Sequence, residues 1–131
     1  MKIAGFTFIR NAIKNDYSIV EAITSILPIC DEFVVAVGQS EDNTLGLIQG
    51  IKSDKIRIIE TIWDETKREG GHVFALETDK AYQAISPDAD WAFYIQGDEC
   101  VHEDDLAGIL MAIKEHQENP EVEGLLFKYR H

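Results

Sequence analysis

Residues 90–105 read DWAFYIQGDECVHEDD, and this stretch decides the predicted fold. An unbroken apolar run over residues 91–95 stops at a polar group, Gln96, Gly97, Asp98 and Glu99. A strand that is apolar on both faces is typical of a parallel sheet with helices on both sides. Ligands of such sheets bind outside the carboxyl ends of the strands. We therefore expect Asp98 and Glu99 to lie at a functional site.

The same carboxylates have a simpler interpretation. Asp98 or Glu99 could cap the helix that follows, because acidic side chains accept hydrogen bonds from the unpaired N–H groups at a helix start. The local sequence does not separate capping from ligand binding. Gly97 favours a site, because a residue without a side chain lets a ligand or a metal approach the backbone.

The composition is that of one soluble globular domain. The chain has 131 residues, 45% of them hydrophobic, and no apolar run long enough to cross a bilayer. The apolar segment near the amino terminus is too short for a signal peptide, so we expect a cytoplasmic protein without a transmembrane segment. Cys30 and Cys100 do not have metal-ligand spacing, and we expect both to be reduced.

The charge of the chain excludes one class of partner. Acidic residues outnumber Lys and Arg by 24 to 12, and the net charge is −12. A nucleic-acid-binding face needs clustered basic side chains, so we expect no nucleic acid partner. An acidic protein can still bind a phosphorylated small molecule through a divalent cation, which favours a metal site.

Strands and helices are predicted to alternate along the chain. The apolar strands are expected over residues 2–9, 33–37, 55–62, 91–95 and 122–131, and the helices over 18–27, 43–51, 72–86 and 103–117. This order predicts a three-layer, Rossmann-like α/β fold with a mostly parallel sheet, strand order 3-2-1-4 plus a final strand. In that order the first and fourth strands are neighbours, and Arg10 and Asn11 would lie beside Asp98.

Several motifs of α/β enzymes are absent from the sequence. There is no glycine-rich dinucleotide fingerprint, Walker loop, nucleophile elbow or zinc-binding helix. A response-regulator receiver would need an acidic pair after the first strand, where this chain has Arg10 and Asn11. It would also need an aspartate after the third strand, where Ile62 and Trp63 stand. These classes are therefore disfavoured.

Three motifs in order are similar to the amino-terminal half of a family 2 glycosyltransferase with a GT-A fold. They are an asparagine-containing loop after the first strand, DEFVV at 31–35 followed by Ser40-x-Asp42-x-Thr44, and the stretch at 90–99. The resemblance covers essentially the whole chain. It implies a nucleotide-diphosphate sugar as donor, a glycan or lipid as acceptor, and Mg²⁺ or Mn²⁺ at the diphosphate.

The resemblance also implies roles for single residues. Asp98 matches the second aspartate of the family's Asp-x-Asp motif and is the expected metal ligand, whereas Gln96 stands in place of the first. A neutral amide there weakens metal affinity because it removes a charge. Arg10 and Asn11 match the loop that meets the base and ribose. Gly38 stands where the family often has an aspartate, and Gln39 or Asp42 could substitute for it.

The family continues well beyond this length. Residues 1–131 are therefore expected to form a single nucleotide-sugar-binding domain without the acceptor site and catalytic base on its C-terminal side. His131 looks like a histidine that the family places at the end of this strand. An unpaired final strand would also be a template for a homodimer.

Two other functions remain open. One is a catalytically inactive α/β binding or assembly module, in which Gln96 marks a decayed metal site. The other is a nucleotidyltransferase, which is disfavoured because residues 9–16 contain no glycine.

Further polar and aromatic residues have two interpretations each. Trp63 is either a packing anchor or a stacking surface for a base or sugar. The cluster at residues 41–44 fits helix capping as well as ligand binding. His72 stands at a predicted helix start, where N–H groups could meet a phosphate. His102 opens the next predicted helix and could touch a ligand, but the acidic residues beside it favour the helix terminus whatever the function.

Overall fold

A computed structural model describes residues 1–67 and 71–126, which form two compact units. The first unit ends at Val101 and the second begins at His102. No helix in these described ranges is long and apolar enough to cross a membrane.

The first unit is built on a parallel sheet of four strands. They are β1 (Ile3–Ile9), β2 (Glu32–Gly38), β3 (Ile56–Thr61) and β4 (Trp91–Tyr94). Their order is β3-β2-β1-β4, as predicted, so β1 lies between β2 and β4. All four strands point the same way, and their carboxyl ends meet at one edge of the sheet.

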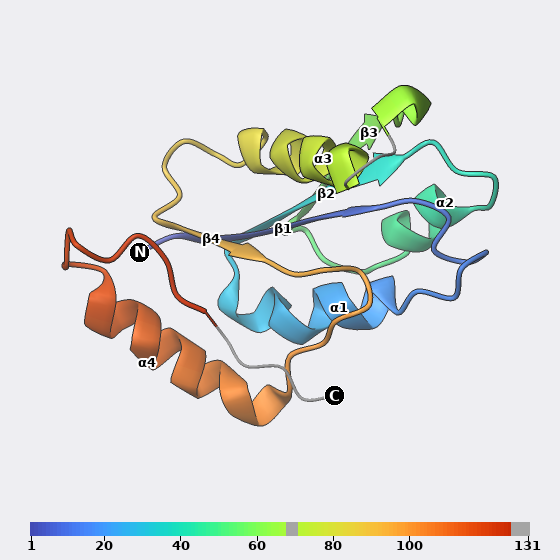
Figure 1. The fold of residues 1–131 in the computed structure, drawn as a ribbon. Helices are drawn as coiled ribbons and strands as arrows, with labels where there is room; N and C mark the ends of the chain where they lie inside the picture. Colours follow the sequence, from blue (N-terminus) through green and yellow to red (C-terminus); the bar gives the residue numbers. More distant parts are fainter. Residues whose placement is uncertain (68–70, 127–131) are drawn as a thin grey trace. The chain divides into compact units, whose positions relative to one another are not determined.

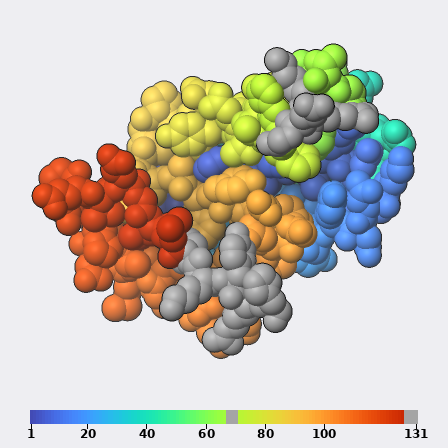
Figure 2. All heavy atoms as spheres, viewed as in Figure 1, coloured from blue at the N-terminus to red at the C-terminus, as the bar shows by residue number. Residues whose placement is uncertain are grey.

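Helices lie on both faces of this sheet (Figure 1). The helix α3 (His72–Gln83) covers one face, and α1 (Ile19–Ile26) and α2 (Thr44–Gln49) lie on the other. The 3-10 turn η1 (Leu27–Ile29) ends the α1 segment at a proline, which cannot continue the helix. The space-filling view shows the green and yellow atoms of α3 directly over the blue atoms of β1 (Figure 2). The predicted three-layer α/β fold is therefore confirmed.

The two faces of the sheet have separate cores because side chains alternate along a strand. On the α3 face, Phe6, Val34, Ala36 and Ala81 form a buried cluster. On the opposite face, α1 buries the apolar stripe predicted from its helical spacing, Ile19, Ala22, Ile23 and Ile26.

The ring of Phe33 lies on the α1 side of the sheet and is fully buried. A Cβ on Gly5 would lie 2.6 Å from Cε2 of this ring, so only glycine leaves room there. The close approach of β1 and Phe33 thus depends on the absence of a side chain at residue 5.

The strand β4 is less buried than its sequence predicts. Phe93 and Ile95 are buried, but Ala92 and Tyr94 on the other face are exposed. The reason is that β4 is an edge strand of the described sheet, whereas β1 and β2 are central. The expectation of a strand buried on both faces is therefore correct for β2 and wrong for β4.

The second unit contains the 3-10 turn η4 (Glu103–Asp105) and the helix α4 (Leu106–His116), within the helix predicted over 103–117. The predicted final strand is not formed over residues 122–126. The chain turns instead, and the N–H of Val122 donates to the carbonyl of Asn119 at 3.1 Å. The rest of that strand, including His131, lies outside the described residues, and the homodimer expected from it stays a prediction.

The two cysteines differ sharply in environment, and neither forms a disulfide. Cys30 is buried, and burial raises the pKa of its thiol to about 12, whereas Cys100 is exposed. Because the thiolate is the nucleophile, we expect one thiol to react with a thiol-specific reagent in the native protein and two in denaturant. Mass spectrometry of the labelled protein should place the native label on Cys100; a native label on Cys30 would contradict the buried position.

Candidate functional site

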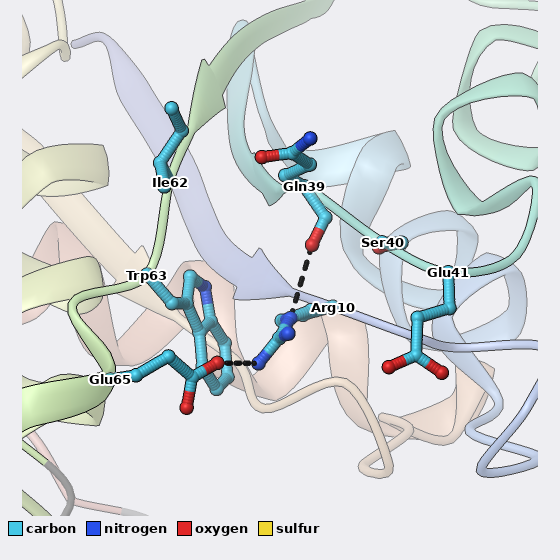
Figure 3. A pocket seen from close by; sticks show the side chains of 7 residues that line it. All are labelled: Arg10, Gln39, Ser40, Glu41, Ile62, Trp63 and Glu65. Carbon is cyan, nitrogen blue, oxygen red and sulfur yellow. Dashed lines mark hydrogen bonds and ion pairs between the residues drawn. The ribbon is translucent and has the colours of Figure 1, made fainter.

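A pocket of about 290 Å³ lies at the carboxyl ends of β1, β2 and β3 (Figure 3). Its lining residues follow these three strands directly: Arg10, Gln39, Ser40, Glu41, Ile62, Trp63 and Glu65. This is the edge at which parallel α/β sheets bind ligands. Of the residues expected at a ligand site, Arg10 and Gln39 are brought together here.

Trp63 forms one wall of the pocket and is held by aromatic packing behind it. Its ring centroid lies 6.0 Å from that of Phe8 and 5.7 Å from that of Phe74, with Phe74 in an edge-on orientation. Phe8 and Phe74 stack on each other at 5.6 Å. Trp63 is therefore a packing anchor that also presents part of its indole to the pocket.

The guanidinium of Arg10 crosses the pocket and is fixed at several points. Its Nε donates to the carbonyl of Gln39 at 3.0 Å, and its Nη1 donates to Oε1 of Glu65 at 2.9 Å (Figure 3). Its Cζ lies 5.3 Å from the centroid of the Trp63 ring, within the range of a cation–π contact. A guanidinium has five N–H donors, so Arg10 keeps donors that could bind an anionic ligand.

Gly38 is required by the position of the Trp63 indole. A Cβ on Gly38 would lie 2.7 Å from Cδ1 of the indole and 3.3 Å from the Cβ of Arg10. The indole N–H faces this backbone, is buried, and has no hydrogen-bond partner among the described residues. Packing against Trp63 thus explains why residue 38 is a glycine and not the aspartate that is frequent in the glycosyltransferase pattern. The sequence alone does not reveal this contact.

Asn11 uses its polar groups to connect two loops. It has a positive φ of 52°, a conformation that asparagine tolerates better than most residues. Its backbone N–H donates to Oγ of Ser40 at 3.0 Å, and its Oδ1 accepts from the N–H of Glu41 at 2.8 Å. Asn11 therefore holds the loop after β1 against the loop after β2.

The Ser40-x-Asp42-x-Thr44 motif completes this connection. Oγ1 of Thr44 accepts from the N–H of Ala12 at 2.9 Å, and Oδ2 of Asp42 accepts from the N–H of Lys14 at 2.8 Å. Oδ1 of Asp42 accepts from the N–H of Thr44 at 3.0 Å and also from the Thr44 hydroxyl. The alternate residues of the motif thus bind successive backbone N–H groups of the β1 loop.

This environment changes the acidity of Asp42. Desolvation is the largest single effect and acts to raise its pKa. The hydrogen bonds from Thr44, Lys14 and Ile13 together outweigh desolvation and hold the pKa below its ordinary value. The ionised carboxylate of Asp42 is therefore part of the scaffold of the site.

Gln96 and Asp98 follow β4 and do not line this pocket. Both are exposed, and the N–H of Gln96 donates to Oε1 of Glu99 at 2.8 Å. Burial raises the pKa of Tyr94, whereas hydrogen bonds with Thr78 and the Gln96 side chain act in the opposite direction. The Gln96 amide is thus in contact with Tyr94, and Glu99 holds the backbone of the turn after β4.

Two further contacts concern residues that were expected near the end of β4. The first and fourth strands are neighbours as predicted, but the contacts that Arg10 and Asn11 make lie on the side of β2 and β3. A Cβ on Gly97 would lie 2.9 Å from Cδ1 of Ile9, so Gly97 also allows close packing of this side chain.

The carboxylates after β4 could hold a metal only together with a ligand. The described residues contain no group of three His, Cys, Asp or Glu side chains that could hold a metal ion. A Mg²⁺ ion that keeps several waters and bridges phosphates needs one or two protein carboxylates. The exposed Asp98 fits that arrangement, in which the ion arrives with a diphosphate.

The two histidines at helix starts differ in their contacts. Nδ1 of His102 accepts from the N–H of Asp104 at 3.1 Å, which is a helix-capping contact. His72 is exposed at the first residue of α3, after Gly71 in a left-handed conformation. His102 therefore caps η4.

No protein-family model and no curated protein sequence matches this chain. Two solved structures are similar to it in fold. The structure of Staphylococcus aureus TarS residues 1–349 matches with a TM-score of 0.64 and 18% identity, over 97% of this chain and 39% of that one. A second S. aureus TarS structure matches with a TM-score of 0.58 and 19% identity, over 88% of this chain and 20% of that one.

The chain therefore shares its α/β fold with the TarS structures. At 18–19% identity the similarity concerns the fold alone. The chain spans well under half of the length of the TarS chains that it matches.

Proposed function

We propose that this chain is the donor-binding part of a glycosyltransferase and binds a nucleotide-diphosphate sugar at the carboxyl edge of its sheet. The observation that carries the proposal is the pocket after β1, β2 and β3, with its wall of Trp63 and Arg10. The glycosyltransferase-like fold supports it. In this proposal the sugar is transferred to a glycan or lipid acceptor.

The base and the diphosphate of the donor each have a chemically matched group in this chain. The flat nucleobase would lie in the pocket against Trp63 and Arg10, where it could accept from the guanidinium and bond the Gln39 side chain. Asp98 would hold Mg²⁺ or Mn²⁺ with the diphosphate. When bound, the cation stabilises the negative charge that builds up on the departing diphosphate.

A second function is favoured by the chemistry of residue 96. An amide in place of a carboxylate leaves Asp98 with fewer charged neighbours, as expected of a binding or assembly module without activity. The two functions differ in one measurable property, because a decayed site would show no metal-dependent binding of a nucleotide.

Calorimetric titration of UDP and then GDP, with and without Mn²⁺, tests the proposal. We expect one of the two nucleotides to bind, and Asp98→Ala to weaken binding in Mn²⁺ by about tenfold or more, equivalent to about 1.4 kcal/mol. The expected loss comes from removing the carboxylate that holds the cation.

Asp54→Ala is a matched control. Asp54 is also an exposed carboxylate, but it precedes β3 at the opposite edge of the sheet, so its removal should leave the affinity unchanged. Equal affinity of the parent chain and Asp98→Ala would refute the metal role, and no binding of either nucleotide would favour the inactive module.

A further inference from the structure

Glu77 is a fully buried carboxylate outside the pocket. It lies on the face of α3 that packs on the sheet, and its side chain is 1% exposed. An isolated buried charge is costly, so its partners must be specific. One partner is Nζ of Lys80, which donates to Oε2 of Glu77 at 2.6 Å from a half-exposed position.

The other partner of Glu77 is Thr61, the last residue of β3. The Thr61 hydroxyl donates to Oε1 of Glu77. The Thr61 carbonyl accepts from the N–H of Gln39 at 2.8 Å, which continues the pairing of β2 and β3 by one residue. Thr61 is therefore fixed by α3 through its side chain and by the β2 loop through its backbone.

The pocket is lined both by the residue that pairs with Thr61 and by the residues that follow Thr61 in the chain. Gln39 lines it, and Ile62 and Trp63 follow Thr61 in the chain. One turn before Glu77, Phe74 packs edge-on against the Trp63 ring. The helix α3 thus contacts the end of β3 twice, once through a buried hydrogen bond and once through an aromatic ring.

We propose that Glu77 is a positioning residue for the pocket: its hydrogen bond with Thr61 fixes the path of the chain from β3 into Trp63 and so sets the orientation of the indole wall. The aromatic contact of Phe74 holds the ring from behind but does not fix the path of the backbone that carries it. The hydrogen bond of Glu77 fixes the orientation of Thr61, because hydrogen-bond geometry is specific. The consequence for nucleotide affinity rests on the proposed function; the effect on Trp63 does not.

Fluorescence of Trp63 tests this proposal in the full chain. The protein has two tryptophans, so Trp91→Phe leaves Trp63 as the only tryptophan, whose emission is observed by exciting tryptophan selectively over the tyrosines. In that background we expect Thr61→Val and Glu77→Leu to shift the Trp63 emission to longer wavelength and to increase its quenching by acrylamide. Glu77→Gln should restore the parent spectrum, because the amide oxygen still accepts from Thr61.

Lys80→Gln is the control for a general loss of stability. It removes the charged partner of Glu77 without touching Thr61, so it should lower the stability and leave the Trp63 emission unchanged. An unchanged emission in Thr61→Val, or an equal shift in Lys80→Gln, would overturn the proposal.

UDP titration adds a second measurement. If the parent chain binds UDP, Thr61→Val should weaken binding by about tenfold while Lys80→Gln does not. If the parent chain does not bind UDP or GDP, the proposed function fails, and the Trp63 spectra still decide the role of Glu77.

Discussion

Gly38→Ala is expected to push the Trp63 indole away from the pocket wall and to lower the stability of the fold. The new Cβ would lie 2.7 Å from Cδ1 of the indole, and the ring is held behind by Phe8 and Phe74. Overpacking of this kind costs about 1–3 kcal/mol. Because the displaced ring is the pocket wall, we also expect nucleotide binding to be lost. Thermal unfolding and UDP titration measure the two effects.

Two variants separate the collision from other effects of a methyl group. In the double variant Gly38→Ala/Trp63→Ala the collision partner is gone, so the combined loss of stability should be smaller than the sum of the single losses. Gly108→Ala places a methyl group where no atom lies within 4 Å, and in a helix this should stabilise by about 0.5–1 kcal/mol. Additive losses in the double variant would show that the Trp63 ring is not what excludes the methyl group.

Asp42→Ala is expected to release the loop after β1. The carboxylate accepts from the backbone N–H of Lys14 and from both the backbone N–H and the hydroxyl of Thr44. The variant removes the acceptor of these three hydrogen bonds. We expect a loss of about 2 kcal/mol, the range for hydrogen bonds to a charged group. Urea unfolding at neutral pH measures it, with Asp54→Ala as an exposed carboxylate whose removal should cost little.

The stabilisation by Asp42 should also depend on pH. Its pKa is lower in the folded protein than in the unfolded chain, so the folded state favours the ionised form. The contribution is therefore fully present above the ordinary aspartate pKa of about 4 and is lost as the pH falls through the lowered pKa of the folded state. We expect the stability difference between the parent chain and Asp42→Ala to shrink below about pH 4. A difference that stays constant down to acidic pH would show that the hydrogen bonds do not depend on the charge.

The fold could be predicted from the sequence because its main determinants are local. The largely apolar run at 3–9 and the uninterrupted one at 33–37 predict strands, and the spacing of Ile19, Ile23 and Ile26 predicts a helix face. Parallel strands need right-handed crossovers, which left few alternatives to the order β3-β2-β1-β4. The same periodicity did not distinguish an edge strand from a central one, so the exposure of Tyr94 was missed.

The sequence predicted the edge of the sheet at which the pocket lies, but only some of the residues that line it. Arg10 and Gln39 could be expected there, because both directly follow a strand that ends at this edge. Glu65 and the contact of Trp63 with Arg10 could not be expected, because Arg10 and Trp63 lie 53 positions apart in the sequence and no local pattern relates them.

The sequence by itself determined the layers and the strand order, through the periodicity of its hydrophobic residues. The common direction of the strands then indicated the edge of the sheet at which a ligand can bind. Only the tertiary structure decided that Gly38 makes room for an indole, that Asp42 and Thr44 hold a neighbouring loop, and that Glu77 is buried against Thr61. The physical reason is the range of the interactions. Strand and helix patterns arise between residues a few positions apart, whereas a packing collision or a buried hydrogen bond depends on which distant segments the fold brings within a few ångströms of each other.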